Sequence, residues 1–314
     1  MTRIGSSDLD VFPLSLGGNV FGWTADRNAS FDILDAYTAA GGDFIDTADF
    51  YSAFAPGNHG GESETIIGEW MTARGNRSQV VVATKVSRHP DFMGLAGANI
   101  LAAADASLGR LQTDVIDLYF AHFDDEETPL EETAGAFDEL VKAGKVRYIA
   151  LSNYSPERIE EYFAVARANG FVLPVALQPH YNLVHRNDFE ETLAPIAERE
   201  NLGVVPYFSL ASGFLTGKYR SKDDLGDSPR ASGAAKFVTP QGLAIIDALD
   251  EIGRAHGVSI TTTALAWLLA KPTVVAPIAS ASKLSQVADL VAVANVTLAP
   301  DEVATLDAVS AWNG

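Results

Sequence analysis

The chain has 314 residues, of which 47% are hydrophobic and 20% are charged, and it contains no cysteine. The lack of cysteine excludes disulfides, thiolate metal sites and cysteine nucleophiles. A net charge of −19 disfavours nucleic-acid binding, because that field repels a polyanion. No apolar stretch reaches the roughly 20 residues that span a bilayer, and the N-terminus lacks the apolar core of a signal peptide. We therefore expect a cytoplasmic protein with no membrane partner.

Strand-like and helix-like segments alternate along the chain. After a possible hairpin over residues 2–12, apolar runs typical of buried parallel strands begin near residues 13, 43, 80, 115, 145, 173, 203 and 273. Helical periodicity with start signals covers 62–73, 131–142, 156–168 and 188–200. Eight strand–helix units predict a single (β/α)8 TIM barrel of the α/β class, and because no linker divides the chain we expect one domain over 1–314.

Two segments interrupt this alternation. Residues 50–61 hold three glycines and a proline without periodicity, and we expect them to form a loop over the mouth of the barrel. Residues 211–239 follow the seventh strand and are rich in Gly, Ser, Asp and Lys. Because long loops in compact domains are usually functional, we predict that this second loop closes over a ligand.

Three of the apolar runs end on residues that can move or steer a proton. Asp46 and Tyr51 follow the run from Phe44, Lys85 ends the run from Val80, and His122 ends the run from Val115. Side chains at the C-terminal ends of barrel strands converge on one mouth, where barrel enzymes carry out their chemistry. We therefore predict that an acid, a phenol, an amine and an imidazole meet there.

This set of residues suggests proton transfer to or from oxygen. A free phenol has a pKa near 10, and a neighbouring cation lowers that value. Lys85, held by Asp46, is expected to make Tyr51 a usable general acid in this way. Alternatives remain for two members of the set: Asp46 and Lys85 could form a structural ion pair, and His122 could be a buried core residue.

Two other site types receive little support from the residues. The segment Gly213–Tyr219 is similar to a P-loop, but it has one residue too few between its glycines and Tyr219 where Ser or Thr should hold magnesium. The six histidines are dispersed and lack metal-ligand spacing. We expect no metal site.

The segment Asp46-Thr47-Ala48-Asp49-Phe50-Tyr51 resembles the first signature of the aldo-keto reductase superfamily. Further matches, in family order from about residue 10 to 290, are Gly61-Glu62-Ser63-Glu64 with Gly68, Thr84-Lys85, Asp117-Leu118-Tyr119 with His122, Gly144-Lys145-Val146-Arg147-Tyr148-Ile149 with Ser152-Asn153, Gln178-Pro179-His180-Tyr181-Asn182, and Pro206-Tyr207 with Gly213-Phe214-Leu215-Thr216-Gly217-Lys218. The resemblance implies a barrel that binds an extended nicotinamide cofactor without a Rossmann domain, and no G-x-G-x-x-G fingerprint occurs. It also implies that Tyr51 is the proton donor in a tetrad with Asp46, Lys85 and His122.

The resemblance further implies which residues hold the cofactor. The positions that it assigns run from the carboxamide end to the adenosine end and are Ser152, Asn153, Gln178, Tyr207, Phe208, Ser209, Leu210, Gly213, Leu215, Lys218, Ile278, Ser280, Ser282, Lys283, Gln286 and Asp289. Around the expected 2′-phosphate position Lys283 is the only cation, and it lacks the fork geometry of arginine. We therefore expect NADPH/NADP⁺ as the cofactor, with use of NADH as an open alternative.

The expected substrate is a small-molecule carbonyl or alcohol, bound by a mostly aromatic rim. Its predicted members are Val20, Phe21, Trp23, Phe54 and Phe123, with Phe208 beside them. The stretch from Asn19 to Trp23 resembles bacterial aldo-keto reductases. Two rival functions stay open: a cofactor-sensing regulatory subunit similar to potassium-channel β subunits, and a barrel hydrolase that pairs Asp46 with Asp49 or Asp124. The oligomeric state is not predicted.

Overall fold

The computed structural model describes residues 1–226 and 231–311. Eight parallel strands form its central sheet: β3 (Ser15–Gly17), β4 (Phe44–Asp46), β5 (Val81–Val86), β8 (Ile116–Ala121), β9 (Val146–Ser152), β10 (Ala176–Gln178), β11 (Gly203–Val204) and β12 (Ile278–Ala279). They are ordered β11-β10-β9-β8-β5-β4-β3-β12. The segment that contains β12 reaches both edges of this sheet, because Ile278 pairs with Ser15 and Val274 pairs with Val204. The sheet is thereby closed, which confirms the predicted barrel.

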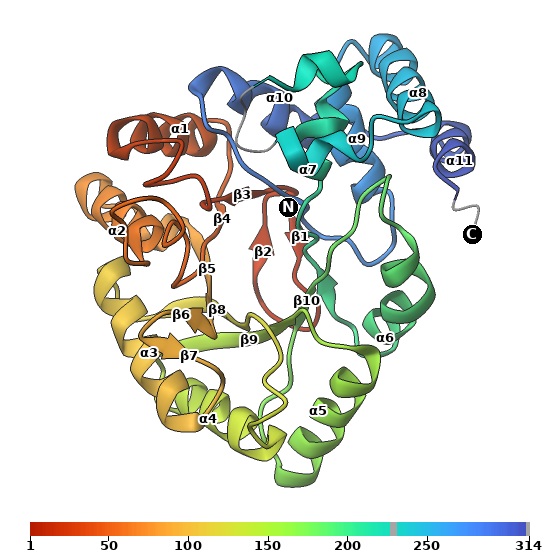
Figure 1. Ribbon diagram of the computed structural model, residues 1–314. Helices are drawn as coiled ribbons and strands as arrows, with labels where there is room; N and C mark the ends of the chain where they lie inside the picture. The colour runs from red at the N-terminus through yellow and green to blue at the C-terminus, as the bar shows by residue number, and fades with distance from the viewer. Residues whose placement is uncertain (227–230, 312–314) are drawn as a thin grey trace.

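Helices surround the strands as an outer ring (Figure 1). The α-helices are α1 (Arg27–Ala39), α2 (Glu62–Arg74), α3 (Gly97–Leu111), α4 (Leu130–Lys142), α5 (Pro156–Asn169), α6 (Ala194–Arg199), α7 (Ala231–Ala235), α8 (Pro240–His256), α9 (Ile260–Leu269), α10 (Val287–Val291) and α11 (Pro300–Val309). Short 3-10 helices are η1 (Arg77–Gln79), η3 (Ala211–Thr216), η4 (Lys222–Leu225), η5 (Leu284–Gln286) and η6 (Ala292–Asn295).

Start and stop signals in the sequence explain where helices begin and end. The Ser155 side chain accepts a hydrogen bond from the Arg158 amide ahead of α5, and Pro156 occupies the first turn, where a missing N–H costs nothing. Gly170 ends this helix with a φ of 68°, a conformation that glycine adopts without strain. The predicted helix over 156–168 is confirmed.

The helix predicted over 188–200 is wrong in one respect, because it is not continuous. A π-helical turn, η2 (Asp188–Leu193), precedes α6, and the amide of Ala194 reaches back to the carbonyl of Phe189. Pro195 has no N–H for the carbonyl four residues before it, so a regular α-helical ladder cannot pass through this point.

The N-terminal hairpin, β1 (Thr2–Arg3) and β2 (Asp10–Val11), closes one end of the barrel. Its apolar residues join a core cluster inside the barrel with alternate strand residues such as Phe44 and Leu118. Neighbouring residues on the other face of the strands, such as Ile45, pack against the helices. This arrangement confirms the predicted hairpin over 2–12.

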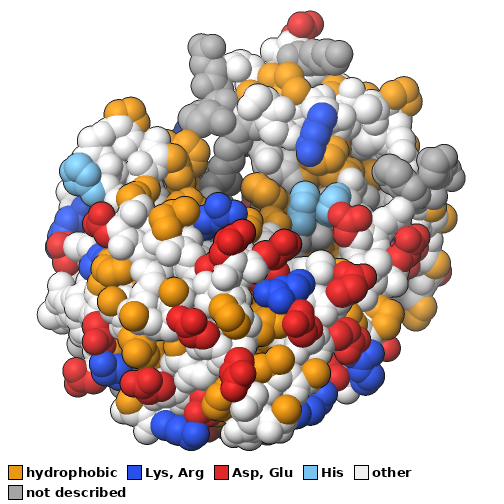
Figure 2. All heavy atoms as spheres, turned by 60° about the horizontal axis from the view of Figure 1, so that its bottom comes forward, with side chains coloured by type: hydrophobic (Ala, Val, Ile, Leu, Met, Phe, Trp, Pro, Cys, Tyr) orange, Lys and Arg blue, Asp and Glu red, His pale blue; other side chains and the backbone are white. Residues whose placement is uncertain are grey.

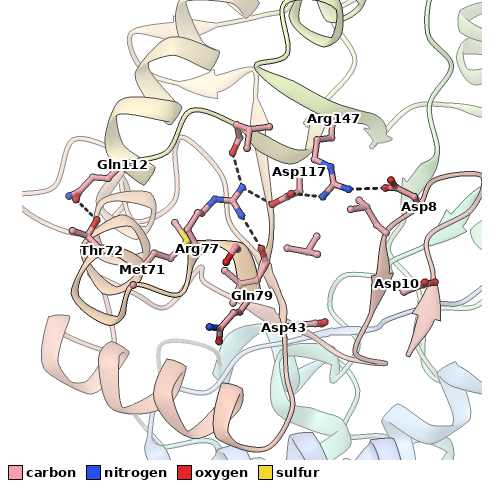
Figure 3. A pocket seen from close by; sticks show the side chains of 16 residues that line it. Asp8, Asp10, Asp43, Met71, Thr72, Arg77, Gln79, Gln112, Asp117 and Arg147 are labelled. Atoms are coloured by element: carbon pink, nitrogen blue, oxygen red, sulfur yellow. Dashed lines mark hydrogen bonds and ion pairs between the residues drawn. The ribbon is translucent and has the colours of Figure 1, made fainter.

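A cavity of about 840 Å³ lies at the hairpin end of the barrel. Figure 3 shows its chain of ion pairs, in which Asp117 accepts from Arg77 at 2.7 Å and from Arg147 at 2.9 Å, and Arg147 also contacts Asp8 at 2.8 Å. The other N–H groups of Arg77 go to Thr113 and to backbone carbonyls. Because these guanidinium groups are engaged by the protein, we assign the network to stabilising this end of the barrel.

The segment after β11 is irregular, as predicted. It contains η3, η4 and α7, and residues 227–230 of the predicted loop 211–239 lie outside the described residues. Among the helices of the described ranges, none has the length and apolarity that crossing a membrane requires. Figure 2 shows acidic and basic side chains interspersed with apolar ones over one face, so the charge there is not gathered into a single patch.

Candidate active site

A cavity of about 890 Å³ opens at the C-terminal ends of the strands, opposite the hairpin. Gly17, Asp46 and Gln178 end their strands, and His122 follows β8 directly. The predicted site residues that line this cavity are Asp46, Tyr51, His122, Asn153, Gln178, Tyr207, Phe208, Ser209, Leu210, Gly213, Lys218, Ile278, Ser280, Ser282, Lys283, Gln286, Asp289, Val20, Phe54 and Phe123.

The four residues of the predicted tetrad meet at one end of this cavity. Lys85 lies beneath its wall and donates to Asp46 Oδ2 at 2.7 Å, to the Thr47 carbonyl at 2.6 Å and to Tyr51 Oη at 3.2 Å. Gln178 Nε2 donates to the second carboxylate oxygen of Asp46 at 2.8 Å. Asp46 and Lys85 are almost completely buried, so the ion pair is protected from solvent screening.

The electrostatics of Tyr51 differ from the sequence-based expectation. Burial, followed by the carboxylate of Asp46 and by Tyr207, raises the pKa of Tyr51 well above its usual value. The expected lowering by Lys85 is wrong for this arrangement, because Asp46 neutralises the ammonium group at closer range than the phenol. Tyr51 is therefore a neutral phenol at physiological pH and holds a proton that it can donate.

His122 is a neutral imidazole in the same wall. Burial, with smaller contributions from the cations Lys85 and Arg88, lowers the pKa of His122 well below its usual value. Its Nδ1 is buried without a hydrogen-bond partner among the described residues. The ring centroid lies 6.0 Å from that of Tyr51. A neutral imidazole at this position can donate one hydrogen bond to an oxygen in the cavity.

Aromatic side chains form most of the rim around Tyr51 and His122. Phe54 and Phe208 are 53% and 54% exposed, which is unusual for large apolar side chains and is typical of a ligand-binding mouth. Trp23 does not line the cavity but packs edge-on against Phe54 at 4.9 Å. Phe21 is fully buried in the core, so of the predicted pair Val20 and Phe21 only Val20 lines the cavity.

A chain of hydrogen bonds orders the predicted carboxamide-binding end. Tyr207 Oη donates to Asn153 Oδ1 at 2.8 Å, and Asn153 Nδ2 donates to Ser152 Oγ at 3.0 Å. Ser152 Oγ in turn donates to the carbonyl of Gln178 at 2.9 Å, is fully buried and does not line the cavity. The side chains of Asn153 and Tyr207 are thereby held in fixed orientations at the cavity surface.

Cations and hydroxyl groups also line the cavity. Neither Lys218 nor Lys283 forms an ion pair within the part of the chain that the structure describes, although both line the cavity. Ser280 Oγ donates to Asn19 at 2.6 Å, and Gln286 accepts from the amides of residues 282 and 283. A lining that combines aromatic rings, amides and cations suits a long ligand that carries both a flat ring and phosphates.

Backbone strain is concentrated along this cavity. Asn153, Phe208 and Ser212 line it and have φ values of 56°, 54° and 58°, a region that residues other than glycine rarely occupy. Such strain persists where the surrounding structure enforces it, commonly at functional sites. Leu215, predicted to contact the cofactor, instead lies fully buried in the core.

Sequence reasoning missed several residues that line the cavity. They are Gly17, Asn19, Thr24, Phe50, Ser212, Thr216, Thr261, Ala279 and Leu290. Asn19 could have been found from its place just after the first strand, whereas Thr261 lies in the first turn of α9 and carries no sequence signal. The ring of His180 stacks on that of His185 at 3.8 Å and lies 5.4 Å from that of Tyr207, so it supports the Tyr207 ring.

Asp49 lies behind the tetrad rather than in the cavity lining. Both of its carboxylate oxygens are buried without a partner among the described residues. Burial and the nearby charge of Glu64 raise the pKa of Asp49 to about 8. This carboxyl group therefore keeps its proton in the folded protein at pH values where the unfolded chain releases it.

Replacing Asp49 with asparagine should raise stability, and by more at pH 8 than at pH 5. Because the folded-state pKa lies above the unfolded value of about 3.9, the wild type loses stability between pH 4 and 8, by about 1.4 kcal/mol per pH unit at most. Asp49→Asn removes that loss, which thermal unfolding at both pH values will measure. Asp32→Asn, at an exposed site, serves as the control. An equal change in Tm at pH 5 and pH 8 would contradict this assignment.

Comparisons with known proteins identify the family of this chain. Residues 13–311 match the model of the Aldo/keto reductase family. The chain is 33% identical over 279 residues to aldo-keto reductase YhdN from Bacillus subtilis, covering 86% of this chain and 80% of that protein. It is 30% identical over 319 residues to norsolorinic acid reductase from Aspergillus flavus, covering 96% of this chain and 78% of that protein.

A further relative carries a different kind of name. Over 319 residues the chain is 33% identical to a probable voltage-gated potassium channel subunit beta from Oryza sativa subsp. japonica, covering 98% of this chain and 95% of that protein. The relatives named as reductases support an oxidoreductase. The closed barrel and the match over residues 13–311 show that this chain belongs to the aldo/keto reductase family.

Proposed function

We propose that this protein is an NADPH-dependent oxidoreductase that reduces the carbonyl group of an aldehyde or ketone. The observation that carries the proposal is the neutral phenol of Tyr51, which lies on the cavity surface 3.2 Å from the Lys85 ammonium group. Its raised pKa makes it a proton donor at neutral pH rather than a base. This protonation state favours reduction over alcohol oxidation, which requires the phenolate.

Each residue of the tetrad has a distinct role in this proposal. Tyr51 donates its proton to the carbonyl oxygen, and the nearby ammonium group of Lys85 stabilises the phenolate that remains. Asp46 keeps Lys85 charged and in position through the 2.7 Å ion pair. The neutral imidazole of His122 donates a hydrogen bond that orients the same oxygen. The bound nicotinamide supplies the hydride.

The residues that would hold the cofactor follow the length of the cavity. The nicotinamide end is suited by Asn153, Gln178 and Tyr207. The fixed amide groups of Asn153 and Gln178 can orient the carboxamide of the cofactor, and the flat ring of Tyr207 can support the nicotinamide ring. Lys218 is suited to the pyrophosphate and Lys283 to the 2′-phosphate, since both cations lack a carboxylate partner among the described residues. The cationic end supports NADPH over NADH.

The substrate class follows from the rim. Phe54, Phe123 and Phe208 present apolar aromatic surface next to Tyr51 and His122, which favours aromatic or otherwise apolar carbonyl compounds. The similarity to a protein named norsolorinic acid reductase, from Aspergillus flavus, supports reduction of a small organic molecule.

Nucleotide titration tests the cofactor assignment. Quenching of the four tryptophans should show saturable binding of NADPH, with weaker binding of NADH. Lys283→Ala should weaken NADPH binding by about tenfold, the typical effect of one hydrogen bond to a charged group, and leave NADH binding nearly unchanged. Lys142→Ala, which removes an exposed charge from α4, away from the cavity, is the control.

Two outcomes of this titration would contradict the proposal. Equal losses of NADPH and NADH affinity in Lys283→Ala would move the 2′-phosphate away from Lys283. Failure of the wild type to bind either nucleotide would overturn the assignment of the cavity to a nicotinamide cofactor.

The relatives named as potassium-channel β subunits support a second candidate, a cofactor-sensing regulatory subunit. It predicts nucleotide binding together with stable co-purification of a membrane channel, whereas the enzyme predicts turnover without a partner. The hydrolase alternative is not supported, because neither Asp49 nor Asp124 lines the cavity and Asp124 is paired with Arg158 at 2.8 Å.

A further inference from the structure

Within residues 1–226 and 231–311, Arg88 is the one arginine that has no acidic partner. Every other arginine among the described residues forms an ion pair with Asp or Glu. The chain has 41 acidic and 22 basic residues, so carboxylates are available almost everywhere on its surface. An exposed guanidinium that no described carboxylate neutralises is available to a ligand.

Arg88 lies outside the cavity lining but directly beside it, against the lining residue Phe123. It lies in β6 (Arg88–His89), three residues after Lys85, in the hairpin formed with β7 (Phe92–Met93). Its guanidinium carbon lies 4.0 Å from the centre of the Phe123 ring, and Phe123 lines the cavity. The Phe123 ring is in turn 5.0 Å from the ring of His122. Arg88 also contributes to the lowered pKa of His122, so its charge is felt at the tetrad.

A second arginine packs over an aromatic ring and also forms an ion pair, which provides a comparison for the contact of Arg88 with Phe123. Arg27 lies 4.2 Å from the centre of the Phe31 ring, but it also forms an ion pair with Glu69 at 2.5 Å. Packing over a ring therefore does not prevent an arginine from binding a carboxylate, because its N–H groups remain free at the edge of the plane. In Arg88 that binding capacity is unused by the described residues.

We infer that Arg88 binds an anionic group of the substrate and makes aromatic carbonyl compounds with an acidic substituent the preferred substrates. This inference rests on the proposed reductase function. Contacts of 6.0, 5.0 and 4.0 Å link the rings of Tyr51, His122 and Phe123 to the guanidinium in sequence. A rigid molecule of one to three rings can therefore place its carbonyl at Tyr51 and its carboxylate at Arg88.

The overall charge makes this cation more important. A protein of net charge −19 repels anionic ligands at long range, so binding one requires a local positive group that is not already neutralised. Lys218 and Lys283 meet that need at the cofactor end of the cavity, and Arg88 meets it beside the tetrad. A carboxylate also accepts two parallel hydrogen bonds from a guanidinium, which fixes orientation as well as position.

Matched substrate pairs test the inference. Reduction by NADPH is measured for 4-formylbenzoate against 4-methylbenzaldehyde, and for 4′-formylbiphenyl-4-carboxylate against biphenyl-4-carbaldehyde. At low salt, the wild type should prefer at least one acid over its neutral partner in kcat/KM by about tenfold, mainly through a lower KM. Arg88→Gln should abolish that preference and change kcat/KM of the neutral aldehydes by less than about twofold.

Controls separate this effect from a structural one. Arg27→Gln removes the same charge from a similar ring contact away from the cavity and should keep the preference, whereas Arg88→Lys should keep part of it. Turnover of the neutral aldehydes shows that each variant is folded. If the wild type has no preference, or if Arg88→Gln lowers both members of a pair equally, the inference about Arg88 is overturned while the reductase proposal stands. If the wild type reduces none of the four aldehydes, both are overturned.

Discussion

Tyr51→Phe should lower kcat for carbonyl reduction by about 100- to 10,000-fold, the range typical of losing a positioned general acid. The phenol is the group of the tetrad that faces the cavity with a proton held by a raised pKa, and phenylalanine keeps the ring while removing that proton. NADPH affinity, measured by tryptophan quenching, should stay nearly unchanged because the ring is retained. Steady-state assays with a neutral aromatic aldehyde measure the loss.

A matched control for this substitution exists elsewhere in the chain. Tyr162 is fully buried on α5, and its hydroxyl has no hydrogen-bond partner among the described residues. Tyr162→Phe should therefore leave kcat unchanged. Turnover by Tyr51→Phe at the wild-type rate would remove Tyr51 from the reaction and require another proton donor in the cavity wall.

Lys85→Met should destabilise the protein by about 3–5 kcal/mol and abolish turnover. Removing one member of a buried ion pair leaves the other as an uncompensated buried charge, and the methionine cannot donate to Asp46, to the Thr47 carbonyl or to Tyr51. The double variant Lys85→Met with Asp46→Asn should recover much of the stability, because no charge is left buried. It should not recover turnover, since the phenolate of Tyr51 still lacks its cation.

Urea unfolding of the single and double variants measures these effects. Lys145→Met, which breaks the exposed pair with Asp105, is the control and should cost less than about 1 kcal/mol. A cost for Lys85→Met no larger than that of the control would mean that the buried pair does not hold the tetrad in place.

The raised pKa of Tyr51 also predicts how the rates of carbonyl reduction and alcohol oxidation depend on pH. Burial and Asp46 keep the phenol protonated, so carbonyl reduction has its proton available throughout the neutral range. Alcohol oxidation needs the phenolate and should become faster as pH rises. The lowered pKa of His122 keeps its imidazole neutral over the same range, so this residue adds no further titration there.

The barrel and the meeting of the tetrad could both be predicted because they depend on local patterns repeated along the chain. Each apolar run of Val, Ile, Leu and Phe specifies a strand buried on both faces, and parallel strands place their C-terminal residues at one mouth. Asp46, Lys85 and His122 end or directly follow such runs, so their convergence follows from topology alone. The helix over 156–168 was equally readable, because its cap and its first-turn proline are neighbours in sequence.

Other properties of the site were decided by the tertiary structure. Residues far apart in the chain decide which of Val20 and Phe21 faces the cavity and whether Asp124 is paired with Arg158. They also decide that Arg88 has no carboxylate partner among the described residues. The raised pKa of Tyr51 depends first on the burial of its phenol and then on the carboxylate of Asp46, and both are set by how distant segments pack. By itself, the sequence determined the strands and the residue types at their ends. Burial and charge pairing, which set the chemistry of those residues, are sums over long-range contacts and were decided only when the chain was folded.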